Sequence, residues 1–248
     1  GSDGTVLGLA QREFTQSFPQ PGWVEHDALE IRDVQVETLR RALADSGVKP
    51  SEVAGVGITN QRETVVVWDR RTGEPIHPAI VWQDRRTSHQ MEQLAADATV
   101  SEMIRARTGL VPDPYFCASK LQWIFDHVDS ARAEADKGHL AFGTIECWLH
   151  WCMTGGKRHI TDESNASRTM LYDIRKRCWD EDLLELFRIP RSILPDVVPC
   201  SGDLGALSVV EGLSIRGMIG DQQSALFGQA CFDRGDAKIT YGTGCFLL

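Results

Sequence analysis

Short apolar segments rich in β-branched residues are separated by polar turns over the first third of the chain. After Asp27, apolar residues instead recur at near-helical intervals from Ile31 to Leu43, and Gly47 interrupts them. Asp27 and Glu30 have capping-box spacing, so we expect a helix that begins after Asp27 and ends before Gly47. The remaining segments predict strands at Thr5–Ala10 (continued by or paired with Gln11–Gln16), Ala54–Thr59, Thr64–Trp68 and Ala79–Trp82.

Helical periodicity dominates the middle of the chain, and strand character returns after it. The expected helices are Ser88–Ala96, Ala118–His127, Thr144–Met153 and Asp180–Phe187. The expected late elements are strands at Leu207–Leu213 and Arg216–Ile219, a helix that follows Asp221 and ends near Gly228, and a strand pair at Ala237–Tyr241 and Cys245–Leu248. This order predicts one α/β domain with a helical insertion at about residues 87–198.

Composition narrows the class of protein. The 248 residues are 42% hydrophobic and 25% charged, which is ordinary for a globular domain, and the formal net charge is −9. An acidic chain without a basic patch argues against nucleic acid or an anionic membrane as partner. Seven scattered cysteines without a CxxC pair indicate reduced thiols in the cytoplasm and no zinc site. No apolar run has the roughly 18 residues of a membrane span, and no signal peptide is evident.

The segment Gly217–Gln229 carries the strongest chemical signal. An apolar run ends at Gly220, and Asp221 then precedes a helical pattern. A carboxylate at the end of a buried strand lies where open α/β sheets place their chemistry. The alternative is that Asp221 only caps the helix. No Walker A motif, dinucleotide fingerprint, nucleophile elbow or metalloprotease helix is present.

Further candidates follow other predicted strands. Arg62 and Glu63 follow a strand and can together donate to and accept from vicinal hydroxyls, or they can form a solvated loop pair. Trp82 and Tyr115 can cover a small polyol or simply pack in the core. The glycines of Gly242-Thr243-Gly244 allow close approach to a phosphate, or they form a plain turn. All seven histidines are interpreted as structural or surface residues.

Taken together, these stretches resemble the glycerol kinases of the FGGY carbohydrate kinase family. The resemblance covers nearly the whole chain. It is carried, in the family's order, by FPQPGWVEHD (Phe18–Asp27), GITNQRE (Gly57–Glu63), AIVWQDRRT (Ala79–Thr87), DPYF (Asp113–Phe116), TDESNASRTMLYDI (Thr161–Ile174), GDQQSALFGQ (Gly220–Gln229) and YGTGCFLL (Tyr241–Leu248).

The resemblance implies an actin-like, ribonuclease H-like fold and ATP-dependent phosphorylation of glycerol to sn-glycerol 3-phosphate. By position, Asp221 resembles the catalytic base, and Thr243, between Gly242 and Gly244, resembles the residue that meets the γ-phosphate. The implied glycerol contacts are Arg62, Glu63, Trp82, Tyr115, Asp221, Gln222 and Phe246. The resemblance also implies ATP and Mg²⁺ as cofactors of the full-length enzyme, with no metal-ligating residue assigned on this chain, and a cytoplasmic homo-oligomer, dimer or tetramer.

Two departures from the family qualify these expectations. The family begins with a strand and an Asp-x-Gly-Thr-Thr loop that this chain does not contain, and a second, nucleotide-binding domain would follow residues 237–248. We therefore expect residues 1–248 to be the substrate-binding first domain of a larger enzyme and to be inactive alone. A smaller departure is Glu146-Cys147-Trp148 in place of Asp-Thr-Trp.

Three other interpretations remain open at this point. One is a kinase of another short polyol or sugar, such as xylulose or gluconate, although two aromatic walls suit a short substrate. Another is a polyol-binding domain without turnover. The third is a structural actin-like domain, which the clustered polar residues disfavour.

Overall fold

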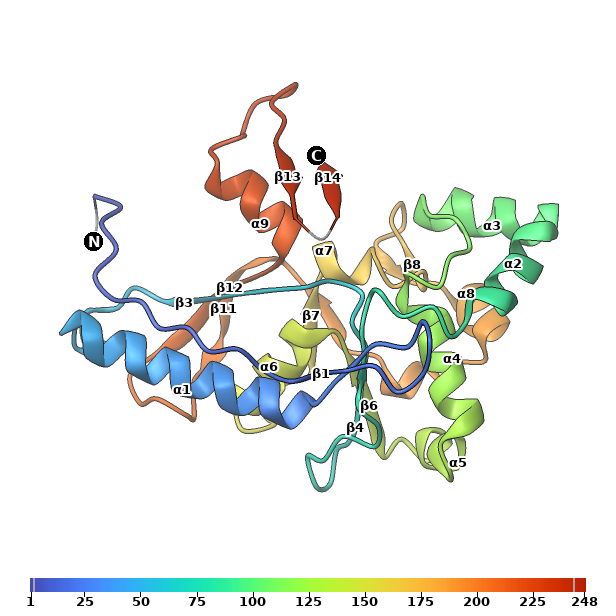
Figure 1. Ribbon diagram of the computed structural model, residues 1–248, viewed down its shortest axis with the longest axis horizontal. Helices are drawn as coiled ribbons and strands as arrows, with labels where there is room; N and C mark the ends of the chain where they lie inside the picture. Colours follow the sequence, from blue (N-terminus) through green and yellow to red (C-terminus); the bar gives the residue numbers. More distant parts are fainter. Residues whose placement is uncertain (2, 243) are drawn as a thin grey trace.

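A three-stranded sheet places the segment after Asn60 beside the segment after Gly220. The computed structural model describes Gly1, residues 3–242 and residues 244–248 (Figure 1). Strand β12 (Ser214–Gly220) pairs in parallel with β3 (Val56–Asn60) and antiparallel with β11 (Ser201–Ala206). Asn60 lies opposite Gly220 in this register, so both strands end at the same edge. The loop after β3 and the start of the helix that directly follows β12 meet there, which is where parallel strands present functional side chains.

A second strand pair separates two hydrophobic cores. Strands β4 (Val66–Asp69) and β6 (Leu140–Gly143) are antiparallel and buried on both faces. Successive strand residues point to opposite faces. Val67 therefore packs in one core with the helices α4 (Cys117–His127), α5 (Ala131–Asp136) and α8 (Glu181–Phe187). Val66 and Trp68 pack in the other core with α1 (Ala28–Ser46) and α6 (Ile145–Met153).

The helices surround these strands, and Figure 1 shows α2 to α5 with α8 gathered at one end of the molecule. The α-helices are α1 (Ala28–Ser46), α2 (Ser88–Ala96), α3 (Ala98–Thr108), α4 (Cys117–His127), α5 (Ala131–Asp136), α6 (Ile145–Met153), α7 (Glu163–Ala166), α8 (Glu181–Phe187) and α9 (Asp221–Gly228), with short 3-10 turns at Pro50–Glu52 and Arg191–Ile193. None of these helices is both long and apolar enough to cross a bilayer.

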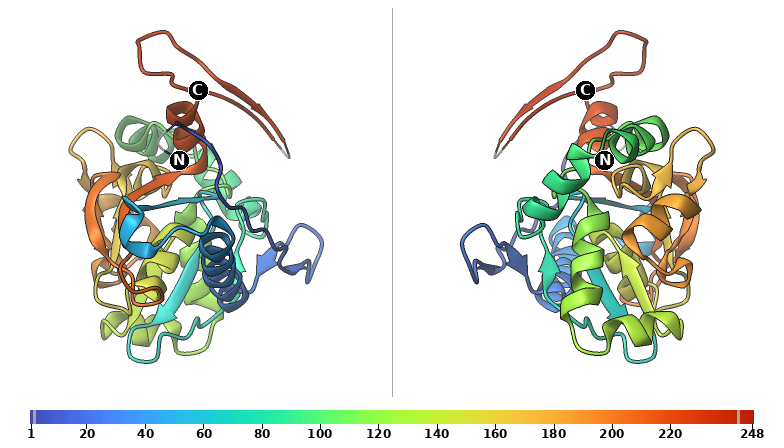
Figure 2. Two further views of the ribbon diagram at one scale, coloured as in Figure 1. Left: turned by 90° about the vertical axis from the view of Figure 1, so that its left-hand side faces the viewer. Right: turned by 90° about the vertical axis from the view of Figure 1, so that its right-hand side faces the viewer.

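Short strand pairs complete the fold. The pairs are β7 (Ile160–Asp162) with β10 (Asp196–Val198), β8 (Tyr172–Asp173) with β9 (Cys178–Trp179), and β13 (Ile239–Tyr241) with β14 (Cys245–Leu247). In addition, β2 (Glu25–His26) lies between β1 (Gln16–Ser17) and β5 (Ala79–Ile80) in a small three-stranded sheet. Figure 2 shows β13 and β14 projecting from the body. Strands β6 to β10 lie within residues 87–198, so this range is not purely helical. These strands have two to four residues each, which is too short for hydrophobic periodicity to distinguish them from helical or irregular segments.

Helix α1 agrees with its predicted ends. The Asp27 carboxylate accepts hydrogen bonds from the backbone N–H groups of Leu29 and Glu30, and Gly47 has φ +67° at the C-terminus. Glu30 does not complete a capping box, because its carboxylate accepts from Thr15 instead. Helices α2, α4, α6, α8 and α9 also match their predicted ranges closely, whereas α3, α5 and the short α7 were not predicted.

Two predicted strands are wrong. Thr5–Ala10 is not a strand, because a groove of about 300 Å³ separates Ala10 from β3. The groove is lined by α1, α6 and the β3 edge opposite β12, and Gly8 lies against the backbone of Ala42 in α1. An extended segment becomes a strand only when a neighbouring backbone accepts and donates its hydrogen bonds. Leu207–Leu213 instead forms the turn between β11 and β12.

Candidate active site

Side chains from five separate segments line one small cavity at the edge where β3 and β12 end. Its volume is about 50 Å³. A larger hollow of about 370 Å³ lies beside His26 and His77, but none of the predicted site residues lines it. The small cavity is lined by Gln61, Arg62, Glu63, Trp82, Tyr115, Asp221, Gln222 and Phe246. The structure thus brings all seven predicted glycerol contacts together and adds Gln61.

The tight junction between β12 and α9 fixes Arg62 against Asp221. Arg62 lies in the loop after β3, is only 7% exposed, and its Nε lies 3.3 Å from Oδ1 of Asp221. Its Nη1 donates to Oε1 of Gln223 at 3.3 Å. A Cβ on Gly220 would lie 2.5 Å from Cδ of Arg62, so the arginine stem crosses this position only because it is glycine.

Asp221 does not act as a helix cap. It is the first residue of α9, and Gly220 takes the N-cap position without a side-chain cap. The carboxylate accepts from the backbone N–H of Gln222 at 2.8 Å and from Gln222 Nε2 at 3.1 Å, and 43% of the side chain is exposed. Gln222 in turn accepts from the buried ammonium of Lys238 at 2.5 Å. The arrangement presents one accessible carboxylate beside a cation, which suits proton acceptance from a bound hydroxyl.

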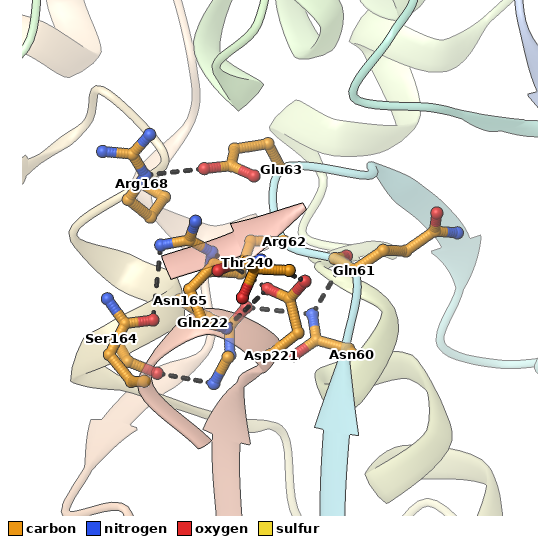
Figure 3. Close-up of polar contacts among 12 residues, drawn as sticks. Asn60, Gln61, Arg62, Glu63, Ser164, Asn165, Arg168, Asp221, Gln222 and Thr240 are labelled. Atoms are coloured by element: carbon orange, nitrogen blue, oxygen red, sulfur yellow. Dashed lines mark hydrogen bonds and ion pairs between the residues drawn. The ribbon is translucent and has the colours of Figure 1, made fainter. Parts of the chain in front are cut away.

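Glu63 is paired with a residue that sequence reasoning missed. Arg62 lies next to it in the chain but pairs with Asp221, and Glu63 Oε1 instead accepts from Nε of Arg168 at 2.6 Å (Figure 3). Glu63 is 1% exposed and has φ +61°, an uncommon conformation for a residue with a side chain. Arg168 stands in the quoted Thr161–Ile174 motif, which could have drawn attention to it.

Aromatic rings form the apolar wall of the cavity. The ring of Trp82 lies edge-on to those of Tyr115 and Phe246, at centroid distances of 5.6 and 6.5 Å. Burial, with a contribution from the charge of Glu63, raises the pKa of Tyr115 to about 12. The fully buried ammonium of Lys120 donates to the Tyr115 carbonyl at 2.6 Å, which anchors this segment from below.

A buried polar network connects the two strand ends beneath the cavity. Asn60 Nδ2 donates to Glu146 Oε2 and to Asn165 Oδ1, each at 2.9 Å. Oγ of Ser164 accepts from the backbone N–H of Gly220 at 2.7 Å. Burial, together with the charge of Asp162, raises the pKa of Glu146 to about 7. In the sequence, this network could have been suspected from Glu146, where the chain departs from the Asp-Thr-Trp pattern of the family.

Two of the predicted phosphate contacts, Gly242 and Gly244, lie at the tip of the hairpin formed by β13 and β14. Gly242 N–H donates to the Gly244 carbonyl at 3.0 Å, which closes the turn. Thr243 is outside the described residues. All seven cysteines are free thiols, and no cluster of three metal-ligating side chains occurs among the residues that the structure describes.

Similar known proteins identify the family of this chain. A family model described as the FGGY family of carbohydrate kinases, N-terminal domain, matches residues 1–228. Glycerol kinase from Acidovorax sp. (strain JS42) is 55% identical, over 99% of this chain and 50% of that protein. Glycerol kinase from Trichlorobacter lovleyi is 56% identical, again over 99% and 50%. The chain spans about half the length of these curated relatives.

Solved structures agree with this result. The crystal structure of Plasmodium falciparum glycerol kinase with ADP has a TM-score of 0.86 and 37% identity, over 95% of this chain and 48% of that one. Xylulose kinase from Rhodospirillum rubrum has a TM-score of 0.84 and 25% identity, over 96% and 49%. These likenesses confirm the expected α/β, actin-like fold of sugar kinases. The chain belongs to the FGGY family of carbohydrate kinases, and residues 1–228 match the N-terminal domain of that family.

Proposed function

We propose that the protein carrying this chain transfers the γ-phosphoryl group of ATP to glycerol, giving sn-glycerol 3-phosphate and ADP. The observation that carries the proposal is the single cavity in which Arg62, Glu63 and Asp221 face the aromatic rings. The similarity to glycerol kinases, one of which was solved with ADP, supports glycerol and ATP as the substrates. A water needs roughly 10–15 Å³, so a cavity of about 50 Å³ suits a molecule of few heavy atoms.

Each lining group has a role in this proposal. Glu63 accepts from a glycerol hydroxyl, Arg62 donates to one, and the aromatic rings pack against the carbon chain. The reacting hydroxyl oxygen forms a bond to the γ-phosphorus, the bond from that phosphorus to the β–γ bridging oxygen breaks, and the hydroxyl proton passes to Asp221. Gln222 orients the Asp221 carboxylate through its side-chain amide.

For ATP binding, we propose fewer contact residues on this chain than for glycerol binding. The turn at Gly242–Gly244 is the proposed contact to the phosphates of ATP. Mg²⁺ is proposed as the companion of ATP, but the donor set at the cavity does not form a metal site, so we assign it no ligand here. We further propose a cytoplasmic homo-oligomer, dimer or tetramer, and the seven free thiols are compatible with a reducing compartment.

A coupled assay of ADP release by the full-length protein tests the activity. We expect turnover with glycerol and at least about tenfold lower kcat/KM with xylulose or gluconate, because those longer chains exceed the small cavity. Preferred turnover of either sugar would assign the protein to another member of the family. Glycerol binding without ADP release would indicate a polyol-binding protein.

A further inference from the structure

Glu63 carries a buried charge close to the substrate cavity and depends on distant residues for compensation. It is 1% exposed, and its backbone has φ +61°. A buried carboxylate without a partner is strongly disfavoured, and a strained backbone persists only where surrounding contacts hold it. The groups that hold Glu63 therefore decide how its carboxylate is oriented toward a substrate hydroxyl.

Arg168 provides this support from the turn after α7. Its Nε donates to Oε1 of Glu63 at 2.6 Å, and its own backbone N–H is held by the Asn165 carbonyl at 2.9 Å. Its guanidinium carbon lies 4.9 Å from the ring centre of Phe116 and 5.7 Å from that of Tyr115. Arg168 does not line the cavity itself. It thus contacts two residues of the cavity wall from outside.

We propose that Arg168 is a positioning residue that sets the affinity for the polyol hydroxyls. It occupies one oxygen of Glu63 and so leaves the second oxygen to accept from substrate. It also holds the ring of Tyr115 through its planar cation. This inference rests on the proposed glycerol kinase function, because it concerns the substrate bound at the same cavity.

The test compares Arg168→Met and Arg168→Lys in the full-length protein. Loss of the guanidinium should raise the KM for glycerol by about tenfold or more, while the KM for ATP stays within about twofold. Lysine keeps the charge and one donor, so it should recover part of the glycerol affinity. Glu63→Gln should add little to the effect of Arg168→Met, since both changes break the same pair.

Arg132→Met is the matched control. Arg132 also combines an ion pair, to Asp126 at 2.9 Å, with an aromatic contact, to Phe125 at 5.6 Å, but away from the cavity. We expect its glycerol KM to be unchanged. If Arg168→Met fails to fold, Arg168→Gln and Arg168→Lys carry the same comparison.

The outcomes separate this inference from the proposed function. A wild-type protein without glycerol turnover would contradict the proposed function itself. An active wild type whose Arg168 variants keep the wild-type glycerol KM would overturn the positioning role. Equal changes in the glycerol and ATP constants, or additive effects of the Glu63 and Arg168 variants, would also overturn it, because they indicate a general structural role.

Discussion

Arg62 and Glu63 are adjacent in sequence but have different partners in space. The chain separates Glu63 from Arg168 by 105 positions and Arg62 from Gln223 by 161 positions. Each side chain is therefore fixed by a polar partner from a different part of the molecule. At the residue scale, the cavity is organised by two ion pairs, Arg62 with Asp221 and Glu63 with Arg168.

Asp221→Asn in the full-length protein tests the proposed base. The amide keeps the size of the carboxylate but cannot accept the hydroxyl proton. We expect kcat to fall by about 10²–10⁴-fold, with glycerol KM within about tenfold of wild type. Asp203→Asn serves as control, because that side chain is 74% exposed on β11. Near-normal turnover by Asp221→Asn in the ADP-release assay would contradict the assignment.

Glu146 gives the chain a pH-dependent stability. Its pKa is raised from 4.5 to about 7 in the folded chain, chiefly by burial. The folded state thus holds an extra proton between these values, and the stability that this contributes is lost as pH rises through about 7. Glu146→Gln removes this titrating group. The free energy of unfolding of the variant should therefore rise relative to that of wild type by up to about 1.4 kcal/mol for each pH unit across that window. Urea unfolding at several pH values measures this, and a constant difference would contradict it.

The junction between β12 and α9 shows how two elements create a site that neither forms alone. Strand β12 ends at Gly220, α9 begins at Asp221, and the stem of Arg62 from the neighbouring loop lies against the glycine. The parallel register of β3 and β12 sets this approach, because Asn60 lies opposite Gly220. The position of the carboxylate is therefore a property of the pair of strands.

Gly220→Ala should disturb this junction. The added methyl would lie 2.5 Å from Cδ of Arg62, so the arginine must move away from Asp221. We expect stability to fall by about 1–3 kcal/mol and kcat/KM for glycerol by about tenfold or more. Gly57→Ala in β3 is the control, since its Cβ would meet no atom within 4 Å. Equal kinetics for the two variants would show that the Arg62 position does not matter.

At the scale of the whole molecule, apolar side chains are exposed around α9 and the projecting hairpin. Phe227 and Phe232 are 69% and 66% exposed and stack edge-on at 5.2 Å, and Tyr241 and Leu247 on the hairpin are also exposed. Exposed apolar clusters of this kind are typical of surfaces that are covered by another part of a protein or by a partner.

A chain of residues 1–248 should therefore bind the dye ANS and self-associate. We expect Phe227→Ser with Phe232→Ser to reduce both effects, because the pair forms the core of the exposed cluster. Val111→Ser is a suitable control, as Val111 is similarly exposed at 58% but lies outside the cluster. Fluorescence titration and light scattering measure the two effects. Equal dye binding by all three proteins would place the accessible apolar surface elsewhere.

Local signals in the sequence were sufficient for several elements. The ends of α1 follow from Asp27 and Gly47, whose effects act within one helical turn, and the strand-to-helix change at Asp221 was evident from an apolar run ending in glycine. The family motifs also identified seven of the eight residues that line the cavity. These features depend on neighbours in the chain or on motifs, so the sequence alone was enough to predict them.

Other features depend on contacts between distant residues. Thr5–Ala10 has a strand pattern but pairs with no strand, because the groove beside β3 lies between them. Arg168 and Glu146 gain their importance only because folding brings them to Glu63 and Asn60. Pairing, burial and charge compensation are properties of the packed molecule. The sequence therefore determined which residues line the cavity, and the tertiary structure decided which of them hold one another in place.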